Sequence, residues 1–158
     1  MQPVLRILVP VDFSSVSKKA LAYAERLIAG TGAELVLLHA FELPATFTRA
    51  DIQNPADPKI RKQFEDLPLV SQDVKVERVL HAGPPGAVIC WMAENRSCDL
   101  IVMGTHGHTG VKHLLLGSVA EYVVRHARCP VLTVSEKPAD QPPLPEPLVT
   151  PVKAPRFM

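Results

Sequence analysis

The sequence predicts an α/β protein built on an open, five-stranded parallel sheet with helices on both faces. Five short apolar segments alternate along the chain with segments whose apolar residues recur at helical spacing. Several of the short segments are almost continuously apolar, which is typical of strands buried on both faces. With 158 residues, 47% of them apolar, the chain is long enough for one domain with a substantial core. This alternation favours a parallel sheet with right-handed crossovers.

The first half of the chain is expected to begin with a strand, a helix and a second strand. Residues 5–11 (LRILVPV) form the first buried strand, and Ser14 or Ser15 caps the helix that follows. Gly30 and Gly32 end this helix. Its apolar face consists of Ala20, Leu21, Ala24, Leu27 and Ile28. The second strand follows immediately at residues 34–40 (ELVLLHA).

The middle of the chain is less regular, because four prolines interrupt residues 42–70. A helix is expected there at about residues 59–67. Residues 74–80 (VKVERVL) alternate like a strand, and HAGPPG at 81–86 is typical of a turn. A helix over 87–94 follows, whose Cys90 and Trp91 we expect in or near the core. The last three elements are a strand, a helix and a strand at 99–103, 119–127 and 131–134.

Composition changes abruptly near residue 136. Seven of the last 23 residues are proline and the apolar periodicity ends, so we expect a domain over 1–135 and a disordered, Pro-rich tail over 136–158. Pro142 and Pro145 form a PxxP pattern that could bind a groove on a partner protein. A solvated spacer is the favoured interpretation, because such patterns arise by chance in Pro-rich segments.

Charge and cysteine content exclude several classes of protein. The net charge is +1 without a basic patch, which argues against a dedicated nucleic-acid or membrane-surface partner. No apolar run approaches the length of a membrane span, and the N-terminus does not resemble a secretory signal. Cys90, Cys98 and Cys129 form no CxxC pair, which favours a reduced, cytoplasmic protein over a disulfide or zinc framework.

The stretch GTHGHTGVKHLLLGS at 104–118 follows the fourth predicted strand. In a doubly wound sheet, ligands bind beyond the carboxyl ends of the strands where the winding reverses, here between the first and fourth strands. Pro10-Val11-Asp12 would lie on the other side of that crevice. Glycines allow close backbone approach, and the helix that Gly117-Ser118 opens presents free N–H groups, so the loop favours a phosphate. Neither GxxxxGK[ST] nor GxGxxG is present.

Several residues also have a structural interpretation. Ser118 and Glu121 fit a capping box as well as Ser118 fits a phosphate contact. Asp12 could cap the helix that follows it, although its place beside the crevice favours ligand contact. His106 and His108 form an HxH pair, but no carboxylate or cysteine accompanies them, which favours ordinary loop residues over a zinc site. His39 and His81 are expected to be packed or turn residues.

The glycine spacing Gly104-x2-Gly107-x9-Gly117-Ser118 resembles the nucleotide-binding signature of the universal stress protein family. Five collinear segments are similar to that family, and the resemblance covers about residues 3–135. They are ILVPVDFS at 7–14, ELVLLHA at 34–40, CDLIVMGTHG at 98–107, LLLGSVAEYVV at 114–124 and CPVLTV at 129–134.

The resemblance implies a Rossmann-like sheet of order 3-2-1-4-5 that binds ATP, with Mg²⁺. It places Asp12 near the ribose or the metal. It implies that Pro10, Val11 and Ala40 lie against the base and that Met103 also lines the pocket. The ribose and phosphates would be surrounded by Gly104, Gly107, Gly117, Ser118 and Val119, and His108 is also expected to bind the nucleotide. It also implies homodimers joined through the last strand, Val131, Leu132, Thr133 and Val134. An apolar edge needs cover, which a second subunit or the tail could supply.

Two residues depart from the family pattern. His108 and His113 occupy positions where the family often has a fixed cation. A histidine becomes cationic only near or below pH ~6.5, so the departure predicts that ATP affinity weakens as pH rises from 6 to 8. An affinity that is flat across that range would contradict this.

Three functions remain open from the sequence. The favoured one is a cytoplasmic, ATP-binding stress-response regulator or sensor. A slow ATPase or nucleotidyl-transfer enzyme is the second, although no catalytic residue can be named. A dimeric interaction module without nucleotide is the third, and the intact glycine pattern argues against it.

Overall fold

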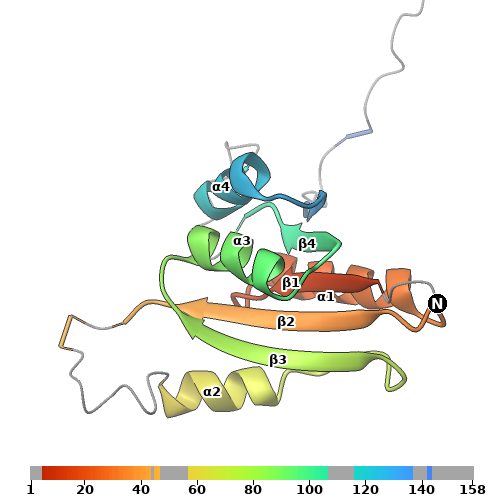
Figure 1. Cartoon of the computed structure of the whole chain (residues 1–158), viewed down its shortest axis with the longest axis horizontal. Coiled ribbons are helices and arrows are strands. Elements are labelled where there is room, and N and C mark those ends of the chain that lie inside the picture. The colour runs from red at the N-terminus through yellow and green to blue at the C-terminus, as the bar shows by residue number, and fades with distance from the viewer. Residues whose placement is uncertain (1–4, 44, 47–56, 107–115, 137–141, 144–158) are drawn as a thin grey trace, which may run out of the picture.

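The five predicted strands form one parallel sheet in the order β3-β2-β1-β4-β5 (Figure 1). The computed structural model describes residues 5–43, 45–46, 57–106, 116–136 and 142–143. The strands are β1 (Arg6–Pro10), β2 (Glu34–Phe41), β3 (Lys75–Ala82), β4 (Leu100–Gly104) and β5 (Val131–Val134). Both the fold class and the strand order are therefore confirmed. Most of the predicted tail lies outside the described residues.

Four helices cover the two faces of the sheet within the described part of the chain. They are α1 (Ser15–Ile28), α2 (Pro58–Glu65), α3 (Pro85–Asn95) and α4 (Ser118–His126). Side chains of α1 and α2 pack on one face, and those of α3 and α4 pack on the other, so that the sheet is buried between two apolar clusters. Leu8 and Val9 of β1, which point to opposite faces, are both fully buried. The continuously apolar strand pattern results from this double burial.

Helix α1 begins where the sequence predicts. Ser14 is its N-cap and accepts a hydrogen bond from the Ser17 amide at 3.2 Å. Gly30 and Gly32 have φ values of +72° and +74°, so the left-handed backbone that ends the helix segment needs glycine. Leu27 was expected on the buried face but is 43% exposed, whereas its neighbour Ile28 is buried.

Two expectations about the 81–94 region are wrong. The turn predicted at 81–86 begins later, because His81 and Ala82 belong to β3, where His81 is packed against Trp91. Trp91, expected in or near the core, is 51% exposed, whereas Cys90 does pack against the core. Helix α3 points Ile89 and Met92 toward the sheet, while Trp91 lies on the flank of the helix above the edge strand β3. The Trp91 ring contacts the His81 ring there, with centroids 5.1 Å apart. Among the described strands, β3 is the edge of the sheet on this side, so no neighbouring strand covers Trp91 there.

The winding reverses between β1 and β4. These strands pair in parallel, with Leu8 beside Ile101, although more than ninety residues separate them in sequence. The chain runs outward from β1 through β2 to β3, then returns to β4 on the other side. The carboxyl ends of β1 and β4 therefore diverge toward different connections, which opens a crevice at that end of the sheet.

Candidate functional site

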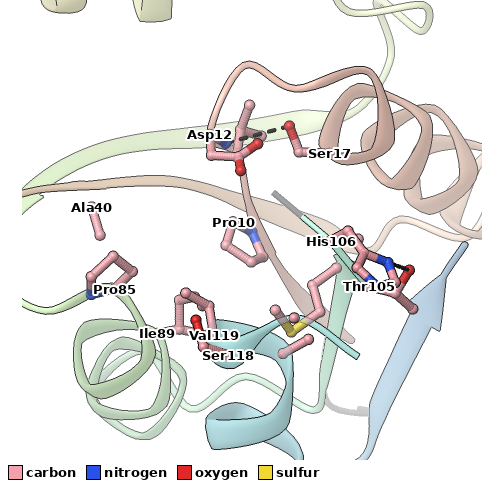
Figure 2. Close-up of a pocket in the computed structure, with 15 residues that line it drawn as sticks. Pro10, Asp12, Ser17, Ala40, Pro85, Ile89, Thr105, His106, Ser118 and Val119 are labelled. Atoms are coloured by element: carbon pink, nitrogen blue, oxygen red, sulfur yellow. Dashed lines mark hydrogen bonds between the residues drawn. The ribbon is translucent and has the colours of Figure 1, made fainter. Parts of the chain in front are cut away.

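A pocket of about 290 Å³ occupies this crevice. Its walls come from the ends of β1, β2 and β4 and from the first turns of α1, α3 and α4 (Figure 2). All of the predicted site residues that lie within the described part of the chain line this pocket. They are Pro10, Val11, Asp12, Ala40, Met103, Gly104, Gly117, Ser118 and Val119. Gly107, His108 and His113 lie outside the described residues.

Six further residues line the pocket that were not predicted as site residues. They are Ser17, Pro85, Ile89, Thr105, His106 and Ala120. Thr105, His106 and Ala120 are next to predicted residues in the sequence. They were missed only because the sequence does not show in which direction their side chains point. Pro85 and Ile89 come from α3 and could have been found only by knowing that α3 leans over the end of β2 beside Ala40.

The walls of the pocket differ in chemistry from one side to the other. Ala40 and Pro85 lie together on one side, with Ile89 near them, and offer only apolar side chains (Figure 2). Thr105 and His106 lie on the opposite side, where His106 Nδ1 is 3.0 Å from Thr105 Oγ1. Such a pocket suits a ligand that has a flat apolar part at one end and polar groups at the other.

Asp12 contributes a carboxylate to the pocket wall, and the same side chain also holds the turn that leads into α1. Its Oδ1 accepts hydrogen bonds from the amide of Ser14, at 3.0 Å, and from the Ser14 hydroxyl. The Asp12 amide donates to Ser17 Oγ at 3.3 Å (Figure 2). Asp12 is thus not the helix cap, which is Ser14, and the capping alternative for Asp12 is wrong. The carboxylate is held against the pocket by its own turn.

The described glycines of the signature have no room for a side chain. A Cβ on Gly104 would lie 2.6 Å from Val16 Cγ1, and a Cβ on Gly117 would lie 3.0 Å from the carbonyl oxygen of Thr105. The Gly117 amide donates to that same oxygen at 2.6 Å, which closes the two ends of the loop on each other. Packing within the protein therefore disfavours a side chain at both positions, more strongly at Gly104, whatever the pocket binds.

Helix α4 opens into the pocket without a side-chain cap. Its N-cap is Gly117, and Glu121 forms an ion pair with Arg125 at 2.8 Å. The capping box predicted for Ser118 and Glu121 is therefore wrong. Ser118 is the first helical residue, and the geometry of an α-helix leaves its amide and the next ones without intrahelical acceptors. With the helix dipole, these amides make the α4 end of the pocket attractive to an anion.

Metal-binding groups do not cluster in this region. Among the described residues, no three His, Cys, Asp or Glu side chains come close enough to hold a metal ion. His39 is packed, as expected, and is 9% exposed.

Comparison with known proteins agrees with this geometry. The sequence model of the Universal stress protein family matches residues 4–135. The chain belongs to the universal stress protein family. It is 32% identical over 139 residues to the universal stress protein MJ0531 of Methanocaldococcus jannaschii, which covers 83% of this chain and 82% of the relative.

Solved universal stress protein structures share the fold. The structure of MJ0577 from Methanocaldococcus jannaschii matches with a TM-score of 0.64 and 30% identity, covering 85% of this chain and 98% of that one. A universal stress protein in complex with cAMP matches with a TM-score of 0.64 at 24% identity, covering 82% and 96%. One from Archaeoglobus fulgidus in complex with dAMP has a TM-score of 0.58 at 20% identity, covering 85% and 99%. At those last two identities the likeness shows the fold alone.

Within the described residues, no helix is both long and apolar enough to cross a membrane.

Proposed function

We propose that this universal stress protein binds ATP in the pocket between β1 and β4 and acts as a cytoplasmic stress-response regulator or sensor. The observation that carries the proposal is the pocket itself, whose lining combines the amino end of α4 with apolar side chains from β1, β2 and α3. Phosphates suit the helix end and an adenine ring suits the apolar side. The solved relatives in complex with cAMP and dAMP support an adenine nucleotide as the ligand class.

The pocket residues fit each part of ATP. Pro10, Ala40 and Ile89 offer an apolar surface to the base. Asp12 can accept hydrogen bonds from ribose hydroxyls or bind the Mg²⁺ that accompanies the nucleotide, since Mg²⁺ sites commonly combine one carboxylate with phosphate oxygens. Ser118 and Val119 lie where the phosphates would be. ATP occupancy would then change the contacts of the surrounding loops.

The regulator is proposed to act as a homodimer joined through β5. The two edges of the sheet differ in chemistry. Strand β3 carries Lys75, Glu77 and Arg78, whereas β5 is Val-Leu-Thr-Val without a charge. Charged residues on an edge strand oppose pairing with another chain, so β5 is the edge suited to it.

Identification of the bound nucleotide tests the proposal. The protein is purified from cells, denatured, and the released small molecules are identified by mass spectrometry. ATP is the expected result. Release of ADP alone would favour the alternative, a slow ATPase, and the absence of nucleotide together with no binding on addition of ATP and Mg²⁺ would contradict the proposal and favour an interaction module.

A further inference from the structure

Buried His39 lies directly behind the turn that carries Asp12. It belongs to β2 and precedes Ala40, which lines the pocket. Successive side chains along a strand point to opposite faces, so His39 lies on the face covered by α1 and α2. It therefore reaches the β1 end from the face of the sheet opposite to Ala40.

The His39 imidazole binds the backbone just before Asp12. Its Nδ1 lies 2.7 Å from the carbonyl oxygen of Val11. A carbonyl oxygen only accepts, so Nδ1 carries the hydrogen in this bond. The Val11 amide donates to the carbonyl oxygen of Leu38 at 2.8 Å. Strand β2 thus holds both polar groups of the Val11 backbone.

The same ring packs against the residue just after Asp12. Phe13 has a φ of +67°, a left-handed conformation that is strained for a bulky residue. Its ring centroid lies 4.6 Å from that of His39, and the His39 centroid lies 6.1 Å from that of Phe64 in α2. Strained backbone persists only where its surroundings hold it. The Phe13 side chain packs against the apolar cluster under α1 and α2, and the His39 ring adds a contact from β2.

We propose that His39 is a positioning residue that holds the Val11 carbonyl and the Phe13 ring so that the Asp12 carboxylate faces the pocket. This inference rests on the proposed function, in which Asp12 meets the ribose or its metal. The bond from the Ser14 amide to Asp12 Oδ1 makes the carboxylate part of the same turn. Loss of the His39 contacts would release the turn, and with it the nucleotide contact of Asp12.

A double-mutant cycle with Asp12 tests the coupling. His39→Phe keeps a ring between its neighbours but removes the donor, and His39→Asn keeps a donor near the position of Nδ1. Calorimetric ATP titration should show about tenfold weaker binding for His39→Phe and recovery of most of it for His39→Asn. In an Asp12→Ala background, His39→Phe should change the affinity by less than about twofold.

A matched control separates positioning from general destabilisation. Ile28→Ala opens a cavity at the far end of α1, where Ile28 is 1% exposed, and should lower the melting temperature without changing ATP affinity. A His39→Phe effect that is fully additive with Asp12→Ala, or one that Ile28→Ala reproduces, would overturn the inference.

A second measurement needs no nucleotide. Amide hydrogen exchange should accelerate at Ser14 in His39→Phe and stay unchanged at Val9 in β1. Unchanged protection at Ser14 would overturn the positioning role. If the unaltered protein binds no adenine nucleotide, the proposed function fails, and exchange at Ser14 still decides whether His39 holds the turn.

Discussion

At the scale of single residues, Gly104 could be a glycine for either of two reasons, room for a ligand or packing within the protein. The sequence suggests close approach of a phosphate, whereas the structure adds the contact with Val16 of α1. Backbone freedom does not enter, because Gly104 is not among the residues with positive φ. The two reasons predict different behaviour when Val16 is made smaller.

Gly104→Ala is expected to destabilise the protein by about 1–3 kcal/mol, since its Cβ would overlap Val16 Cγ1. Adding Val16→Ala should give a double variant that is less destabilised than the sum of the two single changes. Chemical denaturation measures all three. Additive effects would contradict a packing role for Gly104, and ATP titration of the double variant shows whether a ligand role remains.

Cys98 predicts a change of stability with alkaline pH. Burial raises the pKa of its thiol to about 11. Below the pKa of an unfolded cysteine, about 8.5, the thiol is protonated in both the folded and the unfolded state, so its titration does not lower the free energy of unfolding. Between that value and 11 only the unfolded chain releases the proton, so the free energy of unfolding falls as pH rises.

The expected slope from Cys98 is at most about 1.4 kcal/mol per pH unit in that window. The contribution of Cys98 is obtained by measuring the free energy of unfolding against pH for the unaltered protein and for Cys98→Ala. The lysines and tyrosines titrate equally in the two proteins, so the difference between the two slopes belongs to Cys98. Cys90→Ala is the matched control, since Cys90 is only partly buried, and it should keep most of the slope. Identical pH profiles for the protein and Cys98→Ala would rule out this assignment.

At the scale of elements, the start of α4 determines how Ser118 should be tested. From the sequence, a phosphate contact and a capping box predict overlapping effects of Ser118→Ala. The structure removes the overlap, since the cap is Gly117 and Glu121 pairs with Arg125.

Ser118→Ala should therefore leave the free energy of unfolding within about 0.5 kcal/mol of the unaltered protein. It should weaken ATP binding about tenfold, since hydrogen bonds to charged groups contribute more than neutral ones. Ser15→Ala changes the same position of α1, outside the pocket lining, and should not alter ATP affinity. Normal affinity of Ser118→Ala would remove Ser118 from the proposed phosphate site.

Elements were also the scale at which sequence reasoning was most successful. Apolar patterning located the strands and helices of the described residues, because burial of the sheet between two helix layers imposes that pattern on each segment. It failed for Leu27 and Trp91, which are 43% and 51% exposed, because spacing along a helix does not show how far the neighbouring elements cover each flank. It also missed Ile89 as a pocket residue. Periodicity identifies the apolar side of a helix but not which strand end that side covers.

At the scale of the whole molecule, the uncharged β5 edge predicts the oligomeric state. A chain ending at Glu136 should remain dimeric by light scattering if β5 pairs with a second subunit. If the tail covers the edge instead, shortening the chain should change its association.

Thr133→Lys is expected to shift the dimer toward monomer, because it adds to β5 the kind of charge that β3 already carries at Lys75. Thr133 is exposed, so the fold should tolerate the change. Thr31→Lys, in the exposed turn after α1, is the control and should leave the mass unchanged. A Thr133→Lys protein that stays dimeric would place the interface elsewhere.

The adjacency of β1 and β4 also has a consequence for protein synthesis. Asp12, which lines the pocket, is synthesised early, but Ser118, which also lines it, is synthesised only after about three quarters of the chain. A nascent chain that ends before α4 has no pocket, so nucleotide cannot favour its folding. The ligand can act only on the finished domain, by raising the stability of a fold that must already have assembled without it.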